Sequence, residues 1–353
     1  MSEPAPRISE PAVRVSESAP RVSGSAPGVS ESALLEVRDL AVAARSKRGD
    51  LEIVHGVDLV AAPGEAIGVV GESGSGKSLT MLAIMRLLAL PLVINRGSVR
   101  FDGRELTGLP EQQMRDLRGD RIAMVYQDPM TSLNPLMRIG DQVAEAMTAH
   151  GVAKDEARRR TIELLAQVEL PDPERMARSY PHEYSGGMRQ RAVIAMALAM
   201  RPRLLIADEP TTALDVTIQR QILAVVNQLR HDLDMATIWV THDLGVIAQL
   251  VERVVVMYGG YVVEEGPVDQ VFHAPQHPYT SRLLASLPDP ADDTRPPLAQ
   301  IPGRPPVATD EVVGCPFRPR CAQARDICGV RPPLEPRLAG RVACWVPVQE
   351  WTA

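Results

Sequence analysis

Short apolar runs alternate with longer amphipathic stretches through the middle of the chain. Residues 66–70, 204–207 and 237–240 are almost wholly apolar, which is typical of strands buried on both faces. Residues 78–90 and 155–168 instead place apolar side chains at helical spacing, and a further helix is predicted over 190–200. Strands that alternate with helices in this way predict an α/β fold built on a parallel sheet.

Further strands are predicted on both sides of this core. Residues 35–37 form a short apolar run, and residues 53–60 separate their apolar side chains with polar ones. Residues 253–264 have the pattern of a hairpin, because Gly259 and Gly260 tolerate the positive φ of a two-residue turn. The folded part of the chain is therefore expected to begin near residue 34.

The two ends of the chain differ in composition from the middle. Of 31 prolines, five lie in residues 1–33 and thirteen in residues 286–353. Residues 2–32 repeat a Ser-Glu-Pro-Ala pattern every seven residues, but their prolines interrupt a helix too often for a coiled coil. We predict a disordered tail over 1–33, with a tether for a partner as the alternative. The same boundaries predict a folded domain over 34–272 and a C-terminal extension over 273–353.

Charge and hydropathy narrow the function classes. The chain has 38 Lys and Arg against 44 Asp and Glu, a net charge of −6, so it is not expected to bind nucleic acid. No uninterrupted apolar run is long enough for a membrane-spanning helix, and the first residues lack the apolar core of a secretory signal. The cytosol is therefore the expected compartment.

A phosphate-binding loop follows the first buried strand. Its residues are Gly71, Glu72, Ser73, Gly74, Ser75, Gly76, Lys77 and Ser78, which match the pattern G-x-x-x-x-G-K-[ST] between a predicted strand and a predicted helix. Glycines let main-chain N–H groups surround phosphate oxygens, and the helix start adds its positive dipole end. Lys77 is expected to reach the terminal phosphates, and Ser78 to bind Mg²⁺.

A second buried strand ends in two carboxylates, Asp208 and Glu209. Beside a phosphate loop, Asp208 is expected to hold Mg²⁺ through its water shell. Glu209 is expected to orient and begin deprotonating the water that attacks the γ-phosphate. These residues predict a nucleotide hydrolase that uses ATP and Mg²⁺.

The segment from Tyr184 to Gln190, which contains Ser185, Gly186 and Gly187, resembles the signature motif of ATP-binding-cassette (ABC) ATPases. Other motifs of that family follow its order: Gln127 after an apolar strand, then Asp208-Glu209, Asp215 and His242. The resemblance implies a P-loop NTPase fold with a RecA-like core, an antiparallel β subdomain and a helical subdomain. It also implies that Asp215 contacts ATP, that Gln127 contacts Mg²⁺ and the attacking water, and that His242 contacts the γ-phosphate.

Longer matches narrow the resemblance to one branch of that family. Residues 127–135, 180–191, 208–216 and 277–280 resemble the ATP-binding subunits of oligopeptide and dipeptide importers. Such a subunit lies peripherally at the cytoplasmic face of the cell membrane. The resemblance implies two transmembrane permease subunits, a second homologous ATPase chain that forms a heterodimer with this one, and an extracytoplasmic substrate-binding protein. ATP would lie between the phosphate loop of one chain and the Ser-Gly-Gly segment of the other.

Alternatives remain within and outside the importers. Nickel or another small solute is the alternative cargo, because other subunits contact the substrate. DNA-repair ATPases share these motifs but separate them with long coiled coils, whereas 106 residues lie between Ser78 and Ser185 here. Translation-associated relatives carry two cassettes in one chain, and this chain has one.

Adenine recognition departs from the family pattern. Family members usually stack adenine on an aromatic residue upstream of the phosphate loop, and this chain has no Phe, Tyr or Trp before Phe101. Arg45 or Arg48 is the expected substitute.

All four cysteines lie in the C-terminal extension: Cys315, Cys321, Cys328 and Cys344. Their spacing is not that of a zinc finger or ribbon, so the spacing alone selects no metal. Four thiols within thirty residues of a proline-rich segment nevertheless indicate one four-ligand site, which could supply folding energy that a small core does not. Residues 315–321 resemble the extension of peptide-importer ATPases, in which four cysteines are thought to hold a [4Fe-4S] cluster. Zn²⁺ is the alternative metal.

Overall fold

The computed structural model describes residues 33–47, 49–210, 216–286, 300–307, 310 and 312–351. The chain divides into residues 1–31 and residues 32–353, and every described residue lies in the second unit. Residues 1–32 of the predicted tail, Arg48 and Asp215 lie outside the described residues. Among the described residues, no helix is long and apolar enough to cross a membrane.

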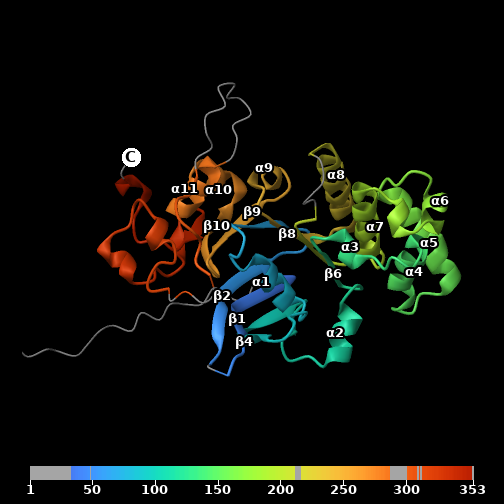
Figure 1. Cartoon of the computed structure of the whole chain (residues 1–353), viewed down its shortest axis with the longest axis horizontal. Coiled ribbons are helices and arrows are strands. Elements are labelled where there is room, and N and C mark those ends of the chain that lie inside the picture. Colours follow the sequence, from blue (N-terminus) through green and yellow to red (C-terminus); the bar gives the residue numbers. More distant parts are fainter. Residues whose placement is uncertain are drawn as a thin grey trace, which may run out of the picture. The chain divides into compact units, whose positions relative to one another are not determined.

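An eight-stranded sheet forms the centre of the fold (Figure 1). Its strand order is β11-β12-β10-β9-β3-β8-β7-β6. The strands β6 (Ile122–Val125), β7 (Leu204–Asp208), β8 (Ala236–Thr241), β3 (Ala66–Val70) and β9 (Arg253–Tyr258) run parallel, as the apolar runs predicted. Parallel strands end at the same edge of a sheet, so the loops that follow β3, β6, β7 and β8 meet there.

The predicted hairpin is confirmed. Strand β10 (Tyr261–Pro267) pairs antiparallel with β9, with Tyr258 opposite Tyr261, and Gly259 and Gly260 have φ of 54° and 84°. The C-terminal strands β11 (Glu335–Arg337) and β12 (Gly340–Val342) continue the sheet beyond β10, where Glu264 lies opposite Val342. The extension therefore shares the central sheet instead of forming a separate core.

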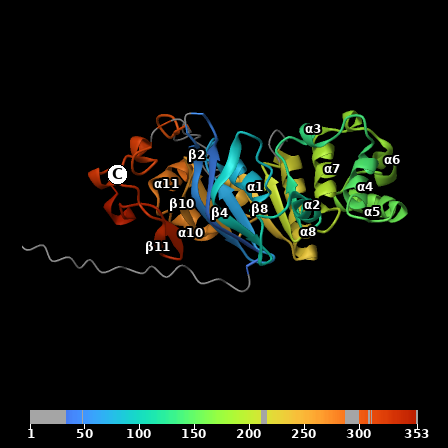
Figure 2. The ribbon, with the colours of Figure 1, turned by 90° about the horizontal axis from the view of Figure 1, so that it is seen from below.

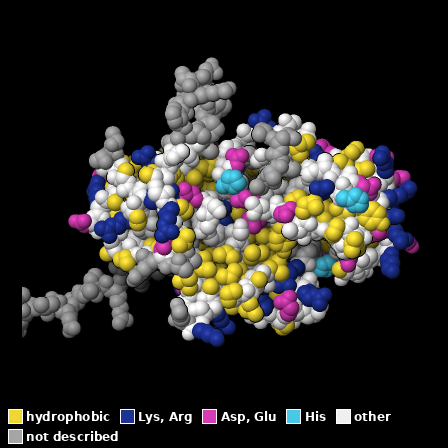
Figure 3. Space-filling view, viewed as in Figure 1, with side chains coloured by type: hydrophobic (Ala, Val, Ile, Leu, Met, Phe, Trp, Pro, Cys, Tyr) yellow, Lys and Arg dark blue, Asp and Glu magenta, His cyan; other side chains and the backbone are white. Residues whose placement is uncertain are grey.

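A second, antiparallel sheet has the order β2-β1-β4-β5. It contains β1 (Leu35–Ala44), β2 (Leu51–Ala61), β4 (Leu92–Phe101) and β5 (Arg104–Glu105). Helix α1 (Lys77–Ile84) packs against β1, β2 and β4 and also against β7, so it joins the two sheets. Hydrophobic side chains gather over this region of the surface (Figure 3).

The remaining helices fall into groups. Four of them, α4 (Ile139–Thr148), α5 (Lys154–Gln167), α6 (Pro173–Arg178) and α7 (Gly186–Leu198), pack together beyond the β6 edge of the central sheet (Figures 1 and 2). The others are α2 (Glu111–Leu117), α3 (Pro129–Ser132), α8 (Val216–Leu233), α9 (Leu244–Ile247), α10 (Val268–His273) and α11 (Pro278–Ala285). The predicted architecture of α/β core, antiparallel β subdomain and helical subdomain is confirmed.

Two predicted helix boundaries are wrong, and the strand expected over 35–37 continues to Ala44. The helix expected over 78–90 ends at Ile84, because Arg86 takes a left-handed φ of 52° and its guanidinium donates to the carbonyl oxygens of Leu106 and Leu109. The helix expected from residue 190 begins at Gly186, where Ser185 caps it. In both cases the deciding contacts involve atoms outside the apolar pattern.

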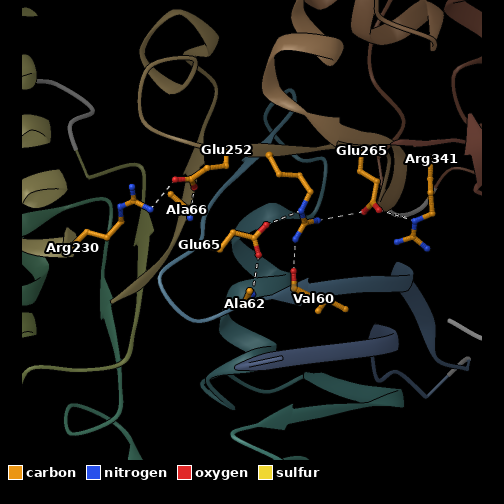
Figure 4. A network of polar contacts seen from close by, with 9 residues as sticks. Val60, Ala62, Glu65, Ala66, Arg230, Glu252, Glu265 and Arg341 are labelled. Atoms are coloured by element: carbon orange, nitrogen blue, oxygen red, sulfur yellow. Dashed lines mark hydrogen bonds and ion pairs between the residues drawn. The ribbon is translucent and has the colours of Figure 1, made fainter. Parts of the chain in front are cut away.

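Ion pairs tie the two sheets together (Figure 4). Arg253 donates from Nε to Glu65 Oε1 at 2.9 Å and from Nη2 to the carbonyl oxygen of Val60. Glu65 in turn accepts from the N–H of Ala62 at 2.8 Å. Arg253 also lies 3.9 Å from Glu265, which Arg341 of β12 contacts at 2.7 Å. This chain of contacts fixes the connection between β2 and β3 against β9, β10 and β12.

Candidate functional site

The loop between β3 and α1 has the geometry of a phosphate cradle. Gly71, Gly74 and Gly76 have φ of 150°, 80° and 97°, values that residues other than glycine rarely adopt. A Cβ on Gly71 would lie 2.1 Å from the carbonyl oxygen of Met257, so no other residue fits there. These glycines let the loop close tightly over the start of α1, where main-chain N–H groups and the helix dipole favour an anion.

Lys77 lies inside this loop. Its side chain is buried, and its Nζ donates to the carbonyl oxygens of Gly71 at 2.7 Å and Glu72 at 3.0 Å. Burial lowers the pKa of Lys77, while the nearby carboxylates Glu209, Asp208 and Glu72 favour its charged form. The ammonium is thus held by neutral acceptors, which phosphate oxygens could replace.

Asp208 and Ser78 lie together at the carboxyl edge of the sheet. Asp208 is the last residue of β7 and is buried, and Ser78 Oγ donates to its Oδ1 at 2.9 Å. Burial raises the pKa of Asp208, and the Ser78 hydrogen bond opposes this shift. A carboxylate and a hydroxyl held side by side are oxygen ligands of the kind that Mg²⁺ takes together with phosphate and water.

Glu209 links the loops after three parallel strands. It has a left-handed φ of 47°, and its N–H donates to the carbonyl oxygen of Val240 at 2.8 Å. Its Oε2 accepts from Gln127 Nε2 at 2.9 Å, and its Oε1 lies 3.1 Å from His242 Nδ1. The three residues predicted to be catalytic are therefore brought together by β6, β7 and β8, although up to 115 positions separate them, since 242 minus 127 is 115.

The Ser-Gly-Gly segment lies elsewhere in the fold. Ser185 caps α7, its Oγ accepting from the N–H of Met188 at 3.3 Å, and both Ser185 and Gly186 are exposed at the start of α7. Helix α7 packs against the helical subdomain, β6 and α8, whereas α1 packs against β1, β2, β4 and β7. Figures 1 and 2 show α1 and α7 at separate places. Within one chain, the structure does not bring these residues to the phosphate loop.

The expected adenine contact can be placed for one of its two candidates. Arg45 is exposed just after β1, and its N–H donates to the carbonyl oxygen of Pro91 at 2.9 Å. This anchors the main chain beside β4 and leaves the side chain at the surface.

The four cysteines line one small cavity together with His277 and Phe317. Cys315 and Cys328 are buried, Cys321 and Cys344 are half-buried, and all four are free thiols. Burial raises the pKa of Cys315 and Cys321 to about 11, so their thiolate forms require a cationic partner. Within the part of the chain that the structure describes, no three His, Cys, Asp or Glu side chains converge as the ligands of a single metal ion do.

Sequence reasoning missed two residues at the phosphate loop. The N–H of Glu72 donates to the hydroxyl of Tyr279 at 2.8 Å, and Arg320 forms an ion pair with the Glu72 carboxylate at 2.6 Å. Tyr279 belongs to the segment 277–280 and Arg320 to the segment 315–321. Both segments resemble importer ATPases, but the resemblance assigns no role to these two side chains. No spacing rule relates either one to residue 72.

Comparisons with known proteins agree with this geometry. A family model described as ABC transporter matches residues 54–212, and one described as oligopeptide/dipeptide transporter, C-terminal region, matches residues 263–328. The oligopeptide transport ATP-binding protein OppD of Salmonella typhimurium is 48% identical over 321 residues, 90% of this chain and 95% of that protein. OppD of Bacillus subtilis is 49% identical over 296 residues, 83% of each chain.

Solved structures match the cassette. The dimeric post-hydrolysis state of the ATP-binding cassette MJ0796, bound to ADP and Pi, aligns with a TM-score of 0.60 at 28% identity, over 66% of this chain and 98% of that one. The cbiO1 protein of Clostridium perfringens, part of the ABC transporter complex cbiONQ, aligns with a TM-score of 0.59 at 25% identity. That match covers 69% of this chain and 92% of the other.

Proposed function

The chain belongs to the ATP-binding subunits of oligopeptide ABC transporters, and we propose that its ATP hydrolysis powers the import of di- or oligopeptides through a membrane permease. The observation that carries the proposal is the convergence of Gln127, Glu209 and His242 beside the phosphate loop. The chain is an ABC-type ATPase that binds ATP and Mg²⁺.

In the proposed mechanism each residue has one task. Lys77 exchanges its carbonyl partners for the β- and γ-phosphates, and the N–H groups of residues 71–78 hold the remaining oxygens. Ser78 and Asp208 would hold Mg²⁺, which neutralises developing charge on the phosphates. Glu209 orients the attacking water and accepts its proton, and His242 contacts the γ-phosphate.

Two chains are needed for a complete site. The start of α7 offers the N–H groups of Ser185, Gly186 and Gly187, and a second chain could present them to the γ-phosphate together with Asp215. ATP fills this gap better than ADP, so closure follows ATP binding and opening follows hydrolysis. The ABC cassette in the MJ0796 structure is dimeric and bound to ADP and Pi, which supports this arrangement.

The permease is proposed to contact the loop after Gln127. Met130 and Leu136 of this loop are 51% and 86% exposed, so both offer apolar surface to a partner. The buried Gln142 holds this loop in place. Its side chain accepts from the N–H of Asn134 and donates to the carbonyl oxygens of Asn134 and Met137. Motion of Gln127 would thus reach two transmembrane subunits at the cytoplasmic face of the membrane.

The cysteine cavity is proposed to hold a [4Fe-4S] cluster on Cys315, Cys321, Cys328 and Cys344. The donor set fits because four soft thiols line one cavity, and a cluster separates its ligands further than a single ion does. Zn²⁺ is the alternative. Anaerobically purified protein should contain about four iron atoms per chain and absorb broadly in the visible range; one zinc atom and no such absorption would contradict the cluster.

Replacing Glu209 with Gln tests the hydrolysis mechanism. The amide keeps the shape but cannot accept a proton, so ATP binding should persist while turnover falls by at least about 10²-fold. Glu163→Gln, on the exposed face of α5, is the matched control and should retain turnover. Hydrolysis near the wild-type rate in the Glu209→Gln complex would refute the assignment.

The cargo requires its own experiment. The purified complex of this chain with its permease, partner ATPase and extracytoplasmic binding protein should hydrolyse ATP faster when di- or oligopeptides are added. Stimulation by Ni²⁺ and not by peptides would establish the alternative cargo.

A further inference from the structure

Glu72, the second residue of the phosphate loop, is held by two residues of the C-terminal extension. Its N–H donates to the hydroxyl of Tyr279 at 2.8 Å. Its carboxylate accepts from Arg320, with Nη1 2.6 Å from Oε2 and Nη2 3.0 Å from Oε1. This two-bond pairing joins residues 248 positions apart and places a cation from the extension beside the phosphate site.

The Arg320 side chain has a partner for each of its five N–H donors. Besides Glu72, it donates to the carbonyl oxygens of Pro302 at 2.9 Å and Ile301 at 3.1 Å, and to the hydroxyl of Tyr258 at 3.1 Å. Only 5% of the side chain is exposed. A guanidinium so fully bonded and so little hydrated has one well-defined position.

Aromatic packing fixes the loop that carries Arg320. Phe317 of the same loop packs against Tyr258 and Tyr279, with ring centres 5.2 and 5.4 Å apart. Tyr258 and Tyr279 also pack together at 4.6 Å. One cluster of rings therefore supports both contacts to Glu72, and the loop itself runs between Cys315 and Cys321.

We propose that Arg320 is a positioning residue for nucleotide binding, which neutralises Glu72 so that the phosphate loop can accept the ATP anion. This inference rests on the proposed assignment of residues 71–78 to the phosphates. A carboxylate in that loop repels a triphosphate, and because Glu72 is only 25% exposed, water screens the repulsion poorly. The guanidinium cancels the charge and keeps the carboxylate turned toward the extension.

A purely structural ion pair would dock the extension without affecting ATP electrostatically. The two roles differ in what Glu72→Gln does. If Arg320 neutralises charge, removing the carboxylate makes Arg320 dispensable for binding. If Arg320 only docks the extension, Glu72→Gln is as damaging as Arg320→Ala.

The test measures the Kd of Mg-AMPPNP for the full-length chain carrying Arg320→Ala, Glu72→Gln or both. We expect Kd to rise about tenfold in Arg320→Ala, equivalent to about 1.4 kcal/mol, and we expect this tenfold rise to disappear when Arg320→Ala is made in the Glu72→Gln background. An unchanged Kd in Arg320→Ala, or a double variant as weak as Arg320→Ala, would overturn the proposal. If Arg320→Ala does not fold, Arg320→Gln, which keeps polar donors, takes its place in the same cycle.

Two controls separate this inference from the assignments beneath it. Arg325→Ala removes an exposed ion pair with Glu350 in the same extension and should leave Kd unchanged. Lys77→Ala should abolish nucleotide binding. If Lys77→Ala binds Mg-AMPPNP with the wild-type Kd, the phosphate-loop assignment fails. If Lys77→Ala loses binding while Arg320→Ala keeps the wild-type Kd, only the role of Arg320 fails.

Discussion

Gly187 is expected to require glycine for two reasons, the approach of the γ-phosphate bound by a partner chain and the close packing of α7 against α8. The substitution Gly187→Ala tests both. Gly187 stands in the Ser-Gly-Gly segment, and a Cβ at this position would lie 2.6 Å from Cγ2 of Ile218 in α8. Ile218 cannot easily turn away, because β-branched side chains in helices strongly prefer one χ1. Gly187→Ala therefore forces a shift between α7 and α8.

The magnitude follows from two opposing terms. Overpacking of this kind costs about 1–3 kcal/mol, and replacing a helical glycine with alanine returns up to about 1 kcal/mol. With the middle of each range, the net loss is about 1.5 kcal/mol, which should lower Tm by about 2–3 °C in a chain of this length, measured by thermal unfolding followed by circular dichroism. ATP hydrolysis by the assembled transporter should fall as well.

Ile218→Ala removes the clashing atom and separates the two reasons. In a double-mutant cycle, Gly187→Ala should cost about 1 kcal/mol less in the Ile218→Ala background. If Gly187 also admits the γ-phosphate of the partner chain, hydrolysis should stay low although stability returns. Recovery of hydrolysis together with stability would show that Gly187 serves packing alone. An unaltered Tm in Gly187→Ala would refute the steric reasoning itself.

Three further predictions concern stability, pH and coupling. Arg253→Ala should lower the free energy of unfolding in urea by about 1–3 kcal/mol, because Glu65 Oε1 and the Val60 carbonyl lose the Arg253 donor, and an effect below about 0.5 kcal/mol would contradict this role. Burial raises the pKa of Glu264 above its ordinary 4.5, so the native state binds a proton more readily than the unfolded state does. The free energy of unfolding should therefore fall as pH rises from 4.5 to the raised pKa of the native state. Glu264→Gln should flatten that pH dependence, and an unchanged slope would argue against it. Gln142→Ala should loosen the loop after Gln127 and lower the peptide stimulation of ATPase activity, whereas wild-type stimulation would disconnect this loop from the permease.

Local sequence patterns predicted the elements in which nearly every residue is buried to the same extent. The strands β3, β7 and β8 lie in the middle of the central sheet, so they are almost wholly buried and appear in the sequence as apolar runs. The turn at Gly259 and Gly260 was likewise predictable, because its φ values require glycine. The end of α1 was not, since it depends on contacts between Arg86 and carbonyl oxygens some twenty residues further on.

The sequence by itself determined the chemistry of this protein. The phosphate loop, the Asp208-Glu209 pair and the Ser-Gly-Gly segment are short motifs in which each residue type meets a local requirement of phosphate, metal or helix start, so they can be recognised without a structure. It also indicated that the four cysteines belong together.

Only the tertiary structure decided how these parts meet. It joined Gln127, Glu209 and His242 at one sheet edge, left Ser185 apart from the phosphate loop of its own chain, and placed Arg320 on Glu72. Such contacts depend on strand order and on the C-terminal extension continuing the central sheet. Residues so far apart in sequence have no periodic or spacing relation, because their proximity is set by the packing of the whole sheet.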